Sequence, residues 1–197
     1  MSFSDAIDRL VGIEPGSRLD HLRAHRGHAR DNAEASYVAL FQPAEWGAAS
    51  QQERHALAVF VSLLHREPDI AAFYAEGLAD DALQTRLGQE AQRGLASGPY
   101  GSYPAGPLSV ENVDGPVFIA SPDLPRRLAA ALTHAHLLVF HPRDASAEAL
   151  QALEAAGWSV DGIVTLSQLA AFLSFQIRVV AGLRLLAKLP VAAPETV

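Results

Sequence analysis

Residues 148–186 read EALQALEAAGWSVDGIVTLSQLAAFLSFQIRVVAGLRLL, and they carry more structural information than any other part of the chain. A short amphipathic helix ends at Gly157, and Trp158 and Ser159 turn the chain. A long, nearly all-apolar helix follows and carries Gln176, Arg178 and Gly182. Because a helix that is apolar on all sides is normally buried, we expect the other elements to pack around this one.

The composition of the 197-residue chain is that of a globular domain. Hydrophobic residues make up 49% and charged residues 19%, which is enough apolar material for a substantial core. The net charge of −7 argues against a general nucleic-acid surface, because phosphate binding requires clustered lysine and arginine. We therefore expect a single domain over residues 1–197 and no nucleic-acid partner.

Polar residues interrupt the longest apolar run, residues 163–189. Arg178 and Arg184 lie deep within it, where a membrane span rarely tolerates charge. The opening residues lack a basic region before an apolar run, so they do not resemble a secretory signal. The chain has no cysteine, which excludes disulfides and thiolate metal sites. We expect a cytoplasmic protein with no membrane partner, whose long helix lies in a core or between subunits.

The helix signals divide the chain into two helical parts, residues 1–96 and 124–190, joined by an ordered loop over 97–123. Ser50 followed by Glu53 is a capping-box pattern, and Pro68 suits the first turn of a helix. The tail over 190–197 is expected to fray. The pattern predicts helices over 2–13, 17–41, 50–64, 68–78, 80–95, 124–140, 146–156 and 160–189.

Residues 97–125 form a long Gly/Pro-rich excursion. Six prolines exclude a regular helix there. The segment is nevertheless rich in large apolar side chains, and a strand-like piece is predicted over 116–120. We expect it to pack against the helical core through six residues: Tyr100, Tyr103, Leu108, Val117, Phe118 and Ile119.

The closing segment resembles that of AhpD-like proteins, members of the alkylhydroperoxidase and carboxymuconolactone decarboxylase superfamily. The family pattern has an arginine at the position of Arg178 and a glycine at that of Gly182, whereas its aspartate becomes Ala181. The resemblance implies an all-α, AhpD-like helical bundle. It also implies a homo-oligomer, built on dimers or trimers, with large helical surfaces between subunits.

The hairpin expected over residues 50–80 occupies the place of the family's active site. The family carries a glutamate there, followed by Cys-x-x-Cys-x-x-x-His. In a gapless alignment Glu53 matches the glutamate, His65 and Pro68 replace the cysteines, and Ala72 replaces the histidine. A shift of two residues also leaves these positions without a thiol or a histidine. Peroxide reduction of this type needs two thiols, so we assign no catalytic residue and no cofactor.

Five residues are candidates for lining a pocket: Glu53, His65, Tyr74, Gln176 and Arg178. The functional interpretation of Glu53 is that an antiparallel return of the chain brings it to Tyr74 and Glu76. Its structural interpretation is a helix cap with Ser50, which we favour. For His65 we favour a turn residue near a helix C-terminus, where a partly positive imidazole is stabilising.

Gln176 and Arg178 are polar residues in the middle of an apolar helix. A buried charge needs a partner, so the structural interpretation of Arg178 is an ion pair with Glu53, Asp69 or Asp161. The functional interpretation is an anchor for a substrate carboxylate. We favour the ion pair.

Three histidines, His21, His25 and His28, have helical spacings that can ligate a metal ion. Several arginines crowd the same segment and oppose cation binding, so we favour a solvated basic face and assign no metal site. His134 and His136 form an HxH pair, which on a helix points to different sides and is a poor chelate.

Two functions remain open from the sequence. The first is a thiol-free AhpD-like protein with a non-peroxidatic binding or structural role, which has itself and a small-molecule ligand as partners. The second is a cofactor-free decarboxylase or isomerase that acts on a small carboxylate or lactone. A general base beside a pocket favours the second, and a pocket with only apolar walls favours the first.

Overall fold

The computed structural model describes residues 5–190, and it confirms the all-α class. Helices, including 3₁₀ turns, make up 67% of the described residues, which form nine α-helices and no strand. Two short 3₁₀ helices, Pro107–Glu111 and Pro142–Asp144, complete the regular structure. The α-helices are α1 (Ala6–Val11), α2 (Arg18–Ala24), α3 (Gly27–Phe41), α4 (Gln51–Leu64), α5 (Pro68–Ala75), α6 (Asp81–Gly94), α7 (Arg126–Phe140), α8 (Ala147–Ala155) and α9 (Val160–Lys188).

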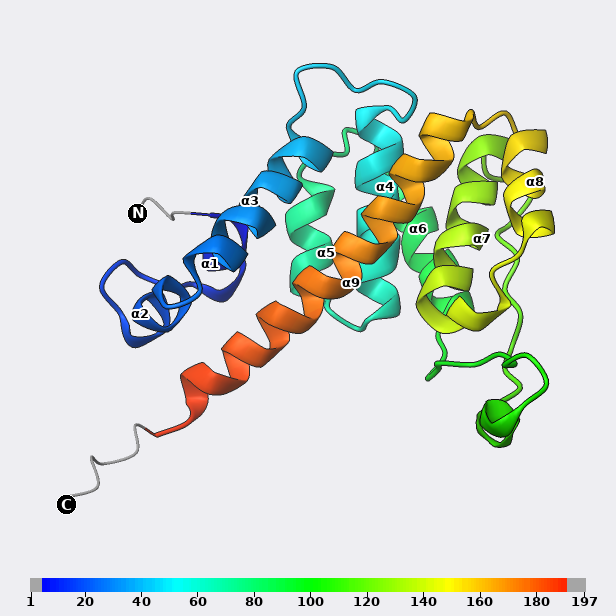
Figure 1. Ribbon diagram of the computed structural model, residues 1–197. Helices are drawn as coiled ribbons and strands as arrows, with labels where there is room; N and C mark the ends of the chain where they lie inside the picture. The colour runs from blue at the N-terminus through cyan, green and yellow to red at the C-terminus, as the bar shows by residue number, and fades with distance from the viewer. Residues whose placement is uncertain (1–4, 191–197) are drawn as a thin grey trace.

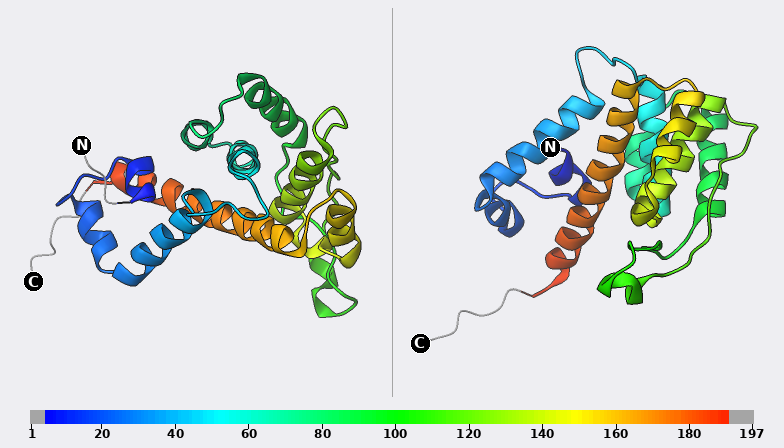
Figure 2. Two further views of the ribbon diagram at one scale, coloured as in Figure 1. Left: turned by 90° about the horizontal axis from the view of Figure 1, so that it is seen from above. Right: turned by 45° about the vertical axis from the view of Figure 1, so that its right-hand side comes forward.

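The long helix α9 connects the two ends of the molecule. Its first half lies beside α7 and α8, and its second half runs past α1 and α3 (Figures 1 and 2). Ser159 caps its N-terminus by accepting a hydrogen bond from the backbone of Gly162. One face of α9 is buried, including Leu169, Leu173 and Val180. By length and composition α9 is also long and apolar enough to cross a membrane.

Helix α4 lies at the centre of the fold and contacts α3, α5, α6, α7 and α9. The predicted capping box begins it: Ser50 Oγ accepts from the Glu53 backbone, and Glu53 accepts from the Ser50 backbone. Pro68 occupies the first turn of α5, as expected, because its missing N–H needs no partner there. Helices α4 and α5 pack as a hairpin that supplies much of the core.

The helix predicted over 17–41 is two helices. The chain turns at His25 and Arg26, between the end of α2 and the start of α3. Gly27 weakens a continuous helix, and the break lets α2 fold back on α1 and α3. His21, His25 and His28 therefore do not share one helical face. No cluster of metal-ligating side chains occurs within residues 5–190.

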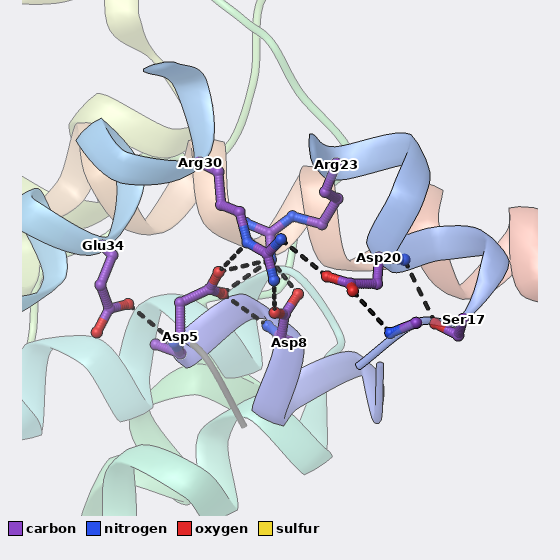
Figure 3. Close-up of polar contacts among 9 residues, drawn as sticks. Asp5, Asp8, Ser17, Asp20, Arg23, Arg30 and Glu34 are labelled. Carbon is purple, nitrogen blue, oxygen red and sulfur yellow. Dashed lines mark hydrogen bonds and ion pairs between the residues drawn. The ribbon is translucent and has the colours of Figure 1, made fainter. Parts of the chain in front are cut away.

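Ion pairs that the sequence analysis missed hold α1, α2 and α3 together (Figure 3). The Arg23 guanidinium donates to Asp5 at 2.8 Å and also to Asp8, and Arg30 contacts both carboxylates. Arg30 further pairs with Asp20 at 2.8 Å. The solvated basic face predicted for this segment is thus wrong for Arg23, which is buried, and for Arg30, which is partly buried.

Residues 95–125 connect α6 to α7 without an α-helix. They contain one 3₁₀ helix and an isolated bridge between Gly101 and Val113, so the predicted strand is absent from the described residues. Phe118 is buried, but Val117 and Ile119 are 83% and 71% exposed. Exposed and buried side chains alternate over residues 117–120, so only part of the predicted packing occurs.

Two of the predicted segments lie at the ends of the chain. The predicted first helix, 2–13, extends beyond α1 into residues 1–4, and nearly all of the predicted frayed tail lies in 191–197; both segments are outside the described residues. Elsewhere helix boundaries agree with the sequence pattern within about three residues.

Candidate functional site

The five candidate residues lie in three separate places, and Glu53 occupies the first. One of its oxygens accepts from Ser50 and the other from Arg127 Nε at 2.6 Å. Burial alone would raise the pKa of Glu53, but the hydrogen bonds from Arg127 and Ser50 outweigh it and lower the pKa. Both oxygens are thus engaged in structural contacts, which agrees with the favoured cap.

Glu53 does not meet Tyr74 and Glu76 in one pocket. The residue of α4 that lies in a pocket with Tyr74 and Glu76 is His55, and its ring packs directly against Gly77. Two residues along a helix turn a side chain by about 200°, so Glu53 and His55 face opposite sides of α4. Glu53 faces a hollow between the first turns of α4, α6 and α7.

Tyr74 and Gln176 form the second place, inside the core between α5 and α9. The Tyr74 hydroxyl donates to Gln176 Oε1 at 2.5 Å, and the Gln176 side chain has no exposed surface. Burial raises the pKa of Tyr74 well above its ordinary value, so its proton stays on the hydroxyl at neutral pH. This pair joins two helices and presents no reactive group to solvent.

His65 and Arg178 form the third place, which is an open cleft of about 1060 Å³. The cleft lies between the C-terminal end of α7 and the middle of α9. Residues Ser97–Pro99, from the chain that leaves α6, close one side. Ser167 and Ser174 contribute hydroxyl groups, while most of the wall is apolar. No carboxylate from the described residues lines it.

His65 is neutral in this cleft. Burial lowers its pKa to about 4, and the charge of Arg178 adds to the effect. Its Nε2 lies 3.4 Å from Ser174 Oγ, so the imidazole and the hydroxyl form one polar patch. A neutral imidazole can donate or accept a hydrogen bond, but a group with this pKa is a weak proton acceptor at pH 7.

Arg178 does not make the ion pair that the sequence suggested. Its side chain is exposed, and Nη1 lies 3.4 Å from the Ser174 carbonyl oxygen. Arg184, and not Arg178, forms the ion pairs between α9 and the α4–α5 hairpin. Its Nη1 lies 3.0 Å from a Glu67 carboxylate oxygen and 3.9 Å from an Asp69 carboxylate oxygen. Six residues separate the two arginines, so they face different sides of α9.

The remaining histidines serve structural contacts. His134 Nε2 lies 3.2 Å from Ser167 Oγ on α9, and His136 Nε2 lies 2.9 Å from the Gly94 carbonyl oxygen on α6. They point to different sides of α7, as the HxH spacing predicted. His141 ends α7 and contacts Asp144 through Nδ1.

The cleft was only partly predictable. His65 and Arg178 were candidates, but Ser174 and the segment Ser97–Pro99 were not. Ser174 could have been found because it lies one helical turn before Arg178 on the same face. The packing of 97–99 against α7 has no local sequence signal, since it depends on where the connection from α6 runs.

The fold and the cleft describe an all-α protein that has a basic, hydroxyl-lined cleft and no thiol. No family model, no curated protein and no solved structure matches this chain. The assignment of a function therefore rests on the geometry of the cleft.

Proposed function

We propose that this protein is a thiol-free, AhpD-like protein that binds a small, largely apolar carboxylate in the cleft between α7 and α9, without redox chemistry. One observation carries the proposal: Arg178 stands beside a mostly apolar cleft in which no carboxylate from the described residues neutralises it. A guanidinium binds a carboxylate through charge-assisted hydrogen bonds. The likeness of the closing segment to AhpD-like proteins supports the family.

The polar groups of the cleft suit such a ligand. Ser174 and neutral His65 can each donate a hydrogen bond, and the apolar wall from α7 and α9 can contact the hydrocarbon part. An acidic side chain in the cleft would repel an anion, and none lines it among residues 5–190. The ligand class is therefore an anion with an apolar body.

The alternative function is a cofactor-free decarboxylase or isomerase that acts on a small carboxylate or lactone. Its supporting observation is that His65 offers a base in the same cleft as Arg178. However, efficient proton transfer requires a pKa near the working pH, and the pKa of His65 is about 4. We therefore favour binding.

The proposal is tested by calorimetric titration with benzoate and hexanoate, using benzamide and hexanamide as neutral counterparts. The carboxylates should bind more tightly than the amides. Arg178→Gln should weaken carboxylate binding about five- to tenfold, because it removes one partly solvated charged contact. Arg126→Gln changes another exposed arginine and should leave binding unchanged. Equal binding of acids and amides would contradict the proposal.

We further propose that the protein is a cytoplasmic homo-oligomer. The apolar outer face of α9 supports self-association, because large apolar side chains there remain exposed in a single chain. Extensive packing of the inner face of α9 against other helices, together with Arg178 and Arg184, supports a location away from the membrane. Light scattering at micromolar concentration should report at least twice the 21.0 kDa mass of the chain.

A further inference from the structure

The outer face of α9 carries an uncovered stripe of side chains. Its seven exposed members within the helix recur at alternating intervals of four and three residues, and the C-cap residue Leu189 continues the spacing: Val164, Gln168, Ala171, Phe175, Arg178, Gly182, Leu185 and Leu189. The large apolar ones are 47–62% exposed. A mean spacing of 3.5 residues is that of a coiled-coil seam, and this one is about 38 Å long.

Two copies of this stripe match each other when they run in opposite directions. A second stripe that runs antiparallel in the centred register pairs Phe175 with Arg178 and Ala171 with Gly182. Further out it pairs Val164 with Leu189, and Gln168 lies opposite Leu185. The face of a phenylalanine ring attracts a guanidinium. Two small residues opposite each other let the helices approach closely. No heavy atom lies within 4 Å of the position that a Cβ would take on Gly182, so this approach is open.

A parallel arrangement of the same stripe is less favourable. In a two-fold parallel pair each residue faces its own copy, so Arg178 would face a second Arg178 in the seam. Like charges at such a distance repel, and the repulsion grows as water is excluded. In the antiparallel register the two Arg178 residues are still only about 4.5 Å apart along the seam, but each lies opposite a Phe175 ring instead of the other guanidinium. The pairing of cation with ring therefore favours the antiparallel arrangement.

We infer that a second copy of this chain covers the stripe in this antiparallel register and completes the cleft between α7 and α9. Phe175 and Arg178 both line that cleft, which is open in one chain. The pairing places the partner's Phe175 against Arg178, where it adds an apolar wall beside the cation. The inference rests on the self-association proposed above and adds its surface, direction and register.

Because the chain has no cysteine, the register can be tested by engineered disulfides. The variants are Ala171→Cys and Gly182→Cys, each purified alone and then mixed and allowed to exchange subunits before oxidation. In the antiparallel register two copies of residue 171 lie about 16 Å apart along the seam, too far for a disulfide, which needs Cα atoms within about 7 Å. Residues 171 and 182 of opposite copies face each other.

Each variant alone should therefore remain uncrosslinked on a denaturing gel, and the mixture should form up to about half covalent dimers. A control mixture of Ala171→Cys with Gln92→Cys, an exposed residue of α6, should remain uncrosslinked. Crosslinking of each variant alone would show a parallel seam and overturn the inference.

A mixture that remains uncrosslinked would also overturn the inference. If light scattering nevertheless shows an oligomer, self-association uses another surface and the general proposal survives. If light scattering shows a monomer, both fail. Carboxylate binding, measured by calorimetry on the unmodified protein, is a separate readout from either result.

Discussion

At the scale of single residues, the environment of each polar group decided its role. Glu53 and His65 both belong to the α4–α5 hairpin, yet two hydrogen-bonding partners fix the charge on Glu53, whereas burial removes the charge from His65. Arg178 is the arginine of α9 that makes no ion pair among the described contacts, and it lines a cleft, whereas Arg184 pairs with Glu67. Position in the cleft, and not residue type or charge state, distinguishes the candidate binding groups from the structural groups.

The low pKa of His65 predicts a pH dependence of stability. The pKa is about 4 in the folded protein and about 6.5 in an unfolded chain, so the unfolded state binds more protons between these values. Stability is therefore lost as pH falls from about 6.5 to about 4. Because the ring is partly exposed, His65→Gln should reduce this loss by about 1–2 kcal/mol at pH 4.5. The measurement is urea denaturation of both proteins at pH 7.5, 5.5 and 4.5.

If the free energy of unfolding falls equally in both proteins as the pH is lowered, the assignment of a low pKa to His65 is contradicted. His55, His134 and His136 also have pKa values lowered by burial, and they are unchanged in the variant. Their contribution therefore cancels in the comparison.

At the scale of elements, buried charge and not apolar packing alone holds the three N-terminal helices together. From its place on α2, Arg23 bridges Asp8 of α1 and Asp5, the N-cap of that helix, and Arg30 reaches the same carboxylates from α3. Burial would raise the pKa of Asp5, but the hydrogen bonds from Arg23, the Asp8 backbone and Arg30 lower it overall. Asp5 is therefore charged at neutral pH.

Removing one member of this cluster should be costly. Arg23→Met leaves Asp5 and Asp8 with less compensating charge in a buried place, and we expect a loss of about 3 kcal/mol in the free energy of unfolding. Arg26→Met removes an exposed arginine two residues after α2 and should change stability by no more than about 0.5 kcal/mol. Urea denaturation at pH 7 measures both. Similar values for the two variants would show that the cluster contributes no specific stability.

At the scale of the whole molecule, α9 connects the core, the cleft and the exposed stripe. Its inner face packs in the core, one side lines the cleft, and its outer face remains free in a single chain. Cleft and stripe share Ala171, Phe175 and Arg178, so ligand binding and self-association are coupled through the same residues in the arrangement that we propose.

The whole protein should lack thiol-dependent peroxidase activity. Such a reaction needs a low-pKa thiolate and a second thiol for regeneration, and the chain supplies neither. Consumption of an organic hydroperoxide by metal-free protein with a dithiol reductant should equal the protein-free rate. Faster turnover that Glu53→Gln abolishes would reveal an active site in the α4–α5 hairpin.

The sequence by itself determined the all-α class and most helix boundaries. Apolar periodicity, the Ser50–Glu53 capping box and Pro68 are local signals, because hydrogen bonds between near neighbours set where helices begin and end. The sequence did not predict the break between α2 and α3, because Gly27 only weakens a helix. The ion pairs that favour the break join Arg23 to Asp5 and Asp8, which lie 15 or more residues earlier in the chain.

Only the tertiary structure decided which candidates share a site. The hydrophobic pattern shows that α9 is apolar, but its position among the other helices decides that Gln176 lies inside and Arg178 outside. The cleft forms where the connection from α6 passes the ends of α7 and the α4–α5 turn. Contacts between segments so far apart depend on packing of the whole core, for which a single sequence carries no local signal.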